Sequence, residues 1–142
     1  MIAINPYLNF PGNTEEAFNF YKNIFGGEFM MVQRFKDTPE GGRTPDHEKD
    51  KLMHISLPVG KNNILMATDV LESMGHKLVE GNNFNLHAAA ESKEEADKIF
   101  NGLSEGGKVT LKIGDTFWGD YFGMVIDKFG INWMVGYTKP KE

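Results

Sequence analysis

The hydrophobic and polar positions of this chain form one pattern that occurs twice. In two stretches, apolar residues recur with the i, i+3, i+4, i+7 spacing of a helix that buries one face. They are Ala17, Phe20, Tyr21 and Ile24 in the first stretch, and Ala96, Ile99, Phe100 and Leu103 in the second. The pattern therefore predicts two equivalent amphipathic helices.

Matching start and stop signals support the equivalence of these helices. Ser92 with Glu95 has the pattern of a capping box, and Asn13 is the weaker counterpart in the first helix. A pair of glycines follows each helix, which is a common C-terminal stop. Glu15 and Glu94 occupy the same position in the two helices and are 79 residues apart. Two unrelated helices are the alternative, which the shared caps, stripes and stops disfavour.

Strand-like segments surround each predicted helix. A short strand precedes each helix, beginning near Pro6 in the first half and near Asn85 in the second. Three further segments rich in β-branched and aromatic residues follow each helix. They are 28–35, 52–58 and 63–68 in the first half, and 109–113, 121–127 and 131–137 in the second. Each half therefore reads β-α-β-β-β, which predicts eight strands and two helices.

Two polar segments interrupt this pattern. Residues 36–51 are rich in charged residues, Pro and Gly, and residues 69–83 join the two halves with a short helical turn predicted near their start. We expect both to be solvated connectors rather than sites. The chain is therefore predicted to be a single domain, 1–142, made of two repeated modules, about 1–68 and 84–142, with the connector at 69–83.

Composition and charge argue against several classes of partner. The chain of 142 residues has a net charge of −5, from 15 basic and 20 acidic residues, without a basic stripe. Phosphate binding needs clustered Lys and Arg, so we expect no nucleic-acid partner. The chain has neither the features of a signal peptide nor an apolar run of membrane-spanning length, so we expect a cytoplasmic protein without a membrane partner. Because the chain has no cysteine, disulfides, thiolate nucleophiles and cysteine-ligated metals are excluded.

Five motifs in this arrangement resemble one known superfamily. They are PYLNF at 6–10, EAFNFYKNIFGG at 16–27, MHISL at 53–57, LMATD at 65–69 and DTFWGDYFGMVIDKFGINWMV at 115–135. With them the chain resembles the vicinal oxygen chelate superfamily, which includes glyoxalase I, extradiol dioxygenases and bleomycin-resistance proteins, and looks most like its PhnB-like branch. The resemblance implies an α+β fold in which two β-α-β-β-β modules form a curled eight-stranded mixed sheet around a cavity. It also implies a homodimer.

The same resemblance bears on metal binding. Catalytic relatives hold a divalent metal with His, Gln or Glu side chains from both modules, and the metal polarises a chelating substrate. By the resemblance, those ligand positions are occupied here by Pro6, Leu65 or Met66, Asn85 and Met134. None of these is a usual metal ligand, so we expect no metal and no cofactor. A site made of two histidines without a carboxylate is the less favoured alternative.

The remaining polar and aromatic positions supply candidates for ligand binding. Strand alternation predicts that His54 shares a face with Ser56, and that His87 shares a face with Asn85. Both histidines can hydrogen-bond a ligand or act as a base near neutral pH, although a partly buried histidine bonded to a backbone carbonyl is the favoured explanation of each. Trp118 is a candidate for stacking on a planar ligand; the alternative is that it fills the end of the sheet or a dimer interface. The candidate cavity residues are His54, Ser56, Asn85, His87 and Trp118.

Three classes of function are compatible with these candidates. The first is a metal-free dimeric protein that binds a small molecule in a mainly apolar cavity, whose wall includes some of the eight methionines. The alternative is a lyase, isomerase or dioxygenase-type enzyme that uses His54 and His87 or a relocated divalent metal. A purely structural module is a third class. Gln33 and Asp69 are further polar candidates that the sequence does not rank.

One enzyme class is not expected. The chain lacks the Gly-rich strand-to-helix loop that cradles a nucleotide-like cofactor. It also lacks the alternating α/β pattern of a doubly wound sheet. We therefore do not expect a SAM-dependent methyltransferase, and the sequence as a whole favours a binding protein over an enzyme.

Overall fold

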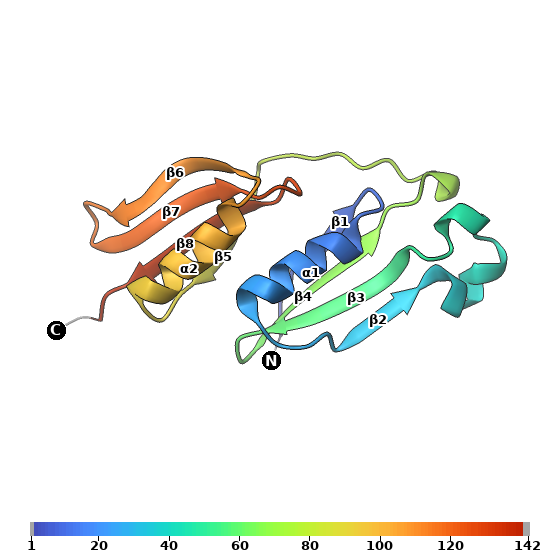
Figure 1. Ribbon diagram of the computed structural model, residues 1–142, viewed down its shortest axis with the longest axis horizontal. Helices are drawn as coiled ribbons and strands as arrows, with labels where there is room; N and C mark the ends of the chain where they lie inside the picture. The colour runs from blue at the N-terminus through green and yellow to red at the C-terminus, as the bar shows by residue number, and fades with distance from the viewer. Residues whose placement is uncertain (1, 141–142) are drawn as a thin grey trace. The chain divides into compact units, whose positions relative to one another are not determined.

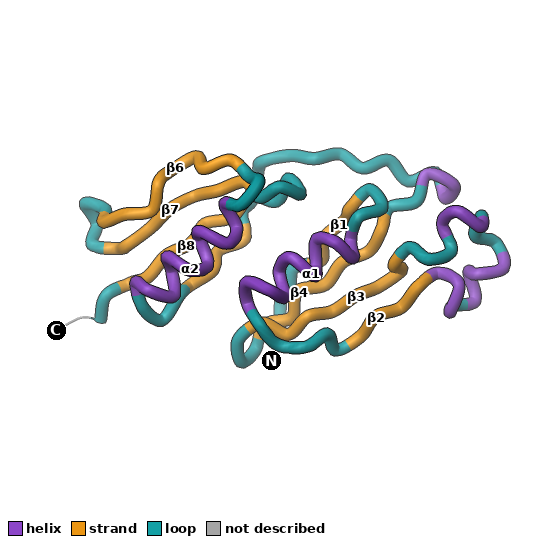
Figure 2. The backbone as a smooth tube through the Cα atoms, viewed as in Figure 1, coloured by secondary structure: helices purple, strands orange, loops and turns teal. Residues whose placement is uncertain are grey.

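The computed structural model describes residues 2–140, and the chain divides into two compact units, Met1–Val79 and Glu80–Glu142. Each unit contains one four-stranded mixed sheet and one α-helix that packs on it (Figure 1). The strands and helices follow the predicted order β-α-β-β-β in each unit (Figure 2). The duplication seen in the sequence is therefore a duplication of structure.

The first unit is built on strands β1 to β4 and helix α1. Their bounds are Tyr7–Phe10 for β1, Thr14–Phe25 for α1, Met31–Arg34 for β2, Leu52–Val59 for β3 and Asn63–Asp69 for β4. The strand order is β1-β4-β3-β2, with β1 parallel to β4 and the other neighbours antiparallel. Because β1 is followed by a helix that crosses the sheet, β1 can pair in parallel with the last strand of its unit.

The second unit repeats this topology with strands β5 to β8 and helix α2. Their bounds are Leu86–Ala89 for β5, Lys93–Ser104 for α2, Lys108–Asp115 for β6, Asp120–Ile126 for β7 and Asn132–Thr138 for β8. The strand order is β5-β8-β7-β6, and β5 is parallel to β8. Among the residues that the structure describes, no helix is long and apolar enough to cross a membrane.

The connectors contain four short 3-10 turns. These are η1 at Phe35–Asp37, η2 at Pro39–Gly42, η3 at Asp46–Glu48 and η4 at Glu72–Met74. The segment between β2 and β3 is more ordered than a solvated connector, because Thr44 and Glu48 are buried. Its end is also tied to the start of α1, since Lys51 Nζ donates a hydrogen bond of 2.8 Å to the carbonyl of Gly12.

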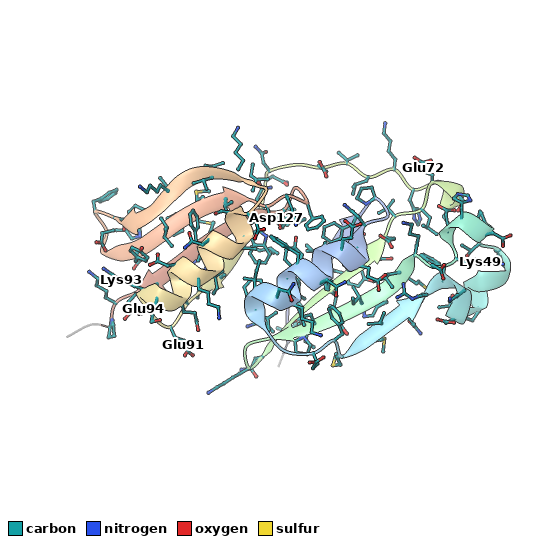
Figure 3. All side chains as sticks on the ribbon, in the orientation of Figure 1. Lys49, Glu72, Glu91, Lys93, Glu94 and Asp127 are labelled. Atoms are coloured by element: carbon teal, nitrogen blue, oxygen red, sulfur yellow. The ribbon has the colours of Figure 1, made fainter. Side chains whose placement is uncertain are left out.

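The start of α2 has the predicted cap. Ser92 Oγ accepts a hydrogen bond of 3.0 Å from the amide of Glu95. The Glu95 carboxylate reaches back to the amide of Glu91, also at 3.0 Å, one residue before the position that a standard capping box uses. Figure 3 labels Glu91 and Lys93 beside this end of the helix. The first bond satisfies an amide that the helix itself leaves free, and the second ties the residue before the cap to the first turn.

The start of α1 is capped by a residue distant in sequence. Asn13 makes no side-chain cap. Instead, Asp69 at the end of β4 accepts hydrogen bonds from the amide and hydroxyl of Thr14, at 3.0 and 2.6 Å. Its second carboxylate oxygen accepts a bond of 2.8 Å from the amide of Leu52. The buried Asp69 side chain therefore joins α1, β3 and β4, which gives this sequence candidate a structural role.

Each core lies between the helix and the sheet face that the helix covers. In the first unit, Phe18 of α1 packs edge-on against Phe10 and Tyr21, with ring centroids 6.4 and 5.7 Å apart. In the second unit, the buried Asp127, which is labelled in Figure 3, accepts a hydrogen bond of 2.8 Å from the Trp133 indole. Burying side chains of this size contributes about 1.5–3 kcal/mol each. The stripe predicted for α2 is the face that it buries. In α1 the buried face differs from the predicted stripe, because Phe18 is buried whereas Phe20 and Ile24 are only half-buried.

We expect Gly123→Ala to destabilise the second unit. A Cβ at Gly123 would lie 2.8 Å from the Cα of Ile113 and 2.9 Å from the Phe100 ring of α2. Such overpacking typically lowers the free energy of unfolding by about 1–3 kcal/mol. Gly114→Ala is the matched control, because nothing lies within 4 Å of its Cβ, and its effect should stay within about 0.5 kcal/mol. Urea unfolding of both variants measures the difference, and equal stabilities would refute this description of the core.

Candidate functional site

The face of each sheet that its helix does not cover carries most of the predicted site residues. In β3, Ile55 and Leu57 are buried toward α1, so His54 and Ser56 lie on the opposite face. We call this the first open face. The strand register and the alternation of side chains assign nine residues to this face: Tyr7, Asn9, Met31, Gln33, His54, Ser56, Ile64, Met66 and Thr68.

A hydrogen-bonded pair lies on the first open face. Tyr7 Oη of β1 is 3.1 Å from His54 Nδ1 of β3, and the two ring centroids are 5.6 Å apart. Strand β4 lies between β1 and β3 in the sheet, so the pair bridges across it. Partial burial raises the pKa of the Tyr7 hydroxyl, which keeps it protonated and able to donate at neutral pH. Tyr7 is nevertheless 47% exposed and accessible to a ligand.

Ser56 is the second notable group on this face. It is 1% exposed, and its hydroxyl has no hydrogen-bond partner among the described residues. Its cross-strand neighbours on the same face are Met31 and Met66. An unsatisfied buried hydroxyl typically costs about 1–3 kcal/mol, so Ser56 is a group that a ligand atom would stabilise.

The first open face carries no fixed charge. None of its described positions is Asp, Glu, Lys or Arg. Arg34 belongs to the helix side, where it forms a two-bonded ion pair with Glu15 of α1 at 2.7 and 3.1 Å. The chemistry of this face therefore depends on hydroxyl, amide, imidazole and thioether groups.

The second sheet has a corresponding face. His87 of β5 pairs with Met134 of β8, while the neighbouring Trp133 and Val135 are buried toward α2. At Gly136 a Cβ would lie 3.4 Å from both His87 Nε2 and the Phe122 ring. The absence of a side chain at Gly136 therefore makes room for these two rings. We call the surface formed by His87, Phe122, Met124, Met134 and Gly136 the second open face.

Trp118 and Asn85 differ in their relation to this surface. Trp118 lies in the turn between β6 and β7, with its ring centroid 5.8 Å from that of Phe122 on the second open face. Its indole donates a bond of 3.1 Å to Asp120, and the side chain is 52% exposed. Asn85 precedes β5 and is exposed, so strand alternation does not assign it a face.

The structure also locates the positions that the resemblance equates with metal ligands. Pro6 precedes β1, and Tyr7 is the residue opposite Met66. In the second unit, His87 rather than Asn85 is opposite Met134. Within each unit, these residues do not supply three nitrogen or oxygen ligands. Residues 2–140 contain no group of three or more His, Asp or Glu side chains arranged to hold a metal ion.

A polar cleft of about 440 Å³ lies elsewhere in the first unit, around the start of α1. Two of its basic side chains are already bonded: Arg34 to Glu15, and Lys51 to the carbonyl of Gly12. The hydrogen bond from Arg34 holds the pKa of Glu15 below its usual value. These contacts fasten the segment before β3 to α1, which is a structural role.

Tyr7 is the site residue that sequence reasoning missed. The signal was present in PYLNF, where Tyr7 and Asn9 alternate with the buried Leu8 and Phe10. Alternation of this kind places Tyr7 on the face opposite the core. Its pairing with His54 depends on strand order, because β1 and β3 are separated by β4. That order cannot be read from a local pattern.

Similarity to known proteins assigns this chain to a family. A family profile described as 3-demethylubiquinone-9 3-methyltransferase matches residues 2–136. The chain belongs to this family. It is a PhnB-like member of the glyoxalase/bleomycin resistance/dioxygenase superfamily, as its motifs predicted.

Individual proteins of similar sequence or structure agree with this assignment. The crystal structure of protein PA1353 from Pseudomonas aeruginosa is 38% identical, with a TM-score of 0.86 over 99% of this chain and 100% of that one. A PhnB protein from Bacillus cereus is 25% identical, with a TM-score of 0.77 over 96% and 100% of the two chains. Protein YjdN of Escherichia coli (strain K12) is 27% identical over 99% of this chain and 98% of its own length.

A more distant structure confirms the fold class. A glyoxalase/bleomycin resistance protein/dioxygenase family enzyme from Burkholderia phytofirmans PsJN is 18% identical, with a TM-score of 0.62 over 96% of this chain and 100% of that one. The predicted glyoxalase/bleomycin resistance fold is therefore confirmed. In this chain its eight strands are divided between two four-stranded mixed sheets.

We expect the Tyr7 hydroxyl to lose its proton at a higher pH than an ordinary tyrosine does. Burial raises its pKa above 10.0, so the folded state holds the phenol proton more tightly than the unfolded state does. The contribution of this group to stability is therefore present below the unfolded pKa and lost as the pH rises through the folded pKa. The difference in absorbance near 295 nm between the native protein and Tyr7→Phe, followed across alkaline pH, isolates this group. A phenol that titrates at or below pH 10 would contradict the geometry.

Proposed function

We propose that this PhnB-like protein binds a small molecule on its open faces through protein groups alone, without a metal or cofactor. The observation that carries the proposal is the Tyr7–His54 pair, which lies on a face uncovered by α1 and keeps hydrogen-bonding capacity available. A polar pair surrounded by apolar side chains is typical of ligand sites, in which a few polar groups fix the orientation of the ligand.

The apolar part of each open face supports the same proposal. Met31 and Met66 flank the polar groups of the first open face, and Met124 and Met134 lie opposite each other on the second. Methionine is unbranched and polarisable, so it adapts to ligands of different shape. Trp118, next to Phe122, adds an aromatic surface on which a planar ligand can stack.

Methyl transfer, which the family description names, is not part of this proposal. In the described part of the chain, parallel pairing is confined to β1 with β4 and β5 with β8, whereas a doubly wound nucleotide-binding sheet is mostly parallel. The turn from β1 to α1 contains a single glycine, Gly12, whose carbonyl is bonded to Lys51. These features do not resemble the loop that holds a nucleotide-like cofactor at a helix start.

We further propose that the protein is a homodimer, as the resemblance implied.

An enzyme is the second candidate function. It is favoured by one observation, the contact between the Tyr7 phenol and the His54 imidazole, because two such groups can move a proton to or from a bound substrate. The substrate would be one with an acidic C–H group, as in lyase or isomerase chemistry. His87 faces the second open face in the other unit, where it is an additional acid–base group.

Methionine methyl NMR tests the binding proposal. We expect compounds from a small-molecule screen to shift the ¹³C-methyl signals of Met31 and Met66, or of Met124 and Met134, because these side chains lie on the open faces. Met74, in η4, is the internal control and should not move. A compound at about 100 times its Kd should also stabilise the fold by about 2.7 kcal/mol.

The outcomes of this screen are distinct. Shifts confined to the methionines of one open face support the proposal, and turnover of the bound compound that is lost in His54→Gln would favour the enzyme. Addition of S-adenosylmethionine should leave all four signals unchanged. A broad screen that moves none of the four methyl groups, or that moves Met74 to the same extent, would contradict the proposal.

A further inference from the structure

The first open face has the groups to recognise one class of ligand. We infer that Tyr7, His54 and Ser56 form a subsite for the carboxylate of a small organic acid whose apolar part lies against Met31 and Met66. The inference rests on the proposed function, since it assigns a ligand class to the same face. It is argued from three properties of the face: spare protons, an unpaired hydroxyl and the absence of negative charge.

The Tyr7–His54 pair always has a proton to spare. With a neutral ring, the pair holds two polar hydrogens, one on the phenol and one on the imidazole. Only one of them can lie in the contact of 3.1 Å between Oη and Nδ1. If the phenol donates, the ring proton is on Nε2; if Nδ1 donates, the phenol proton is free. In either tautomer one donor remains for a ligand oxygen, and protonation of the ring adds a second.

Ser56 supplies another donor beside this pair. It is two residues from His54 on the same face of β3, about 6–7 Å along the strand. Its buried hydroxyl has no hydrogen-bond partner among the residues that the structure describes. The neighbouring Met31 is 46% exposed, so its flexible side chain can move to admit a ligand. A ligand oxygen there would satisfy a hydroxyl that the protein itself leaves unsatisfied.

Charge favours an anionic oxygen over a neutral one. Across β1, β2 and β4, the described residue that faces His54 and can titrate is Tyr7, and no carboxylate on this face competes for the donors. Asp69 and Glu15 lie on the helix side, where Thr14 and Arg34 occupy them. A carboxylate therefore meets donors without repulsion, and its hydrogen bonds are strengthened by its charge. Protonation of His54 would add attraction.

The apolar surroundings define the rest of the ligand. Met31, Ile64 and Met66 give the face hydrophobic walls, and none of its positions is a Lys or Arg that would bind a phosphate. A polyanion would need more charge than this face provides. An alkyl or aryl monocarboxylate fits both the polar and the apolar parts of the subsite.

The test compares acids with their own amides. Hexanoate, benzoate, phenylacetate and 4-phenylbutyrate are each titrated beside the matching primary amide, with the Met31 and Met66 methyl signals as the readout. At about pH 6, we expect at least one acid to bind about fivefold or more tightly than its amide.

Two variants assign the preference to the subsite. Tyr7→Phe and Ser56→Ala each remove one hydroxyl, and each should reduce the acid-over-amide preference to about twofold or less. Tyr137→Phe in β8 and Ser73→Ala in η4 remove the same groups elsewhere and should leave the preference unchanged. Because Ser56 Oγ has no partner to lose, Ser56→Ala should fold with undiminished stability.

The failures of the two proposals are distinguishable. If acids and amides bind the first open face equally, or if the preference survives in both variants, the carboxylate subsite is overturned while small-molecule binding stands. If neither series shifts Met31 or Met66, the first open face does not bind these compounds. Both the carboxylate subsite and the proposed binding of small molecules on this face are then refuted.

Discussion

A single helix can cover only one face of a four-stranded sheet, and this constraint determines what each unit of the protein can do. Phe18 and Tyr21 of α1, and Phe100 of α2, are buried against one side of their sheets. The opposite sides receive no helix from their own unit. Polar and apolar side chains that no core requires therefore lie there, including the Tyr7–His54 pair and four methionines. The candidate site is a consequence of how each core is built.

Much of this fold could be predicted because its signals are local. Helical stripes, glycine stops and the Ser92 cap place both helices, and alternation in β3 places His54 and Ser56 on one face. The long-range contacts could not be predicted. The Asp69 cap of α1 and the Tyr7–His54 bond join residues 55 and 47 positions apart, and both depend on strand order. For the same reason, the prediction that Pro6 and Asn85 occupy the two equivalent ligand positions was wrong by one residue. In the structure, Tyr7 and His87 are the residues opposite Met66 and Met134.

Family membership fixes the fold more firmly than the chemistry. The superfamily assignment rests on nearly the whole chain, whereas the description of the family names methyl transfer. One fold supports many functions, so the chemistry has to be argued from the site. Here the open faces present an imidazole, a phenol, a free hydroxyl and thioethers. Such groups orient an organic ligand by hydrogen bonds and shape, and they are a poor set for a divalent cation.

Binding without a metal is the central claim, and native mass spectrometry tests it most directly. The purified protein would be measured after incubation with Mn²⁺, Ni²⁺, Zn²⁺ or Fe²⁺, and again after EDTA treatment. The claim predicts no metal held in fixed stoichiometry under any of these conditions, because neither open face offers three suitable ligands within its unit. One metal ion per chain that EDTA removes, and that His54→Ala or His87→Ala abolishes, would contradict it and direct the search to chelating substrates.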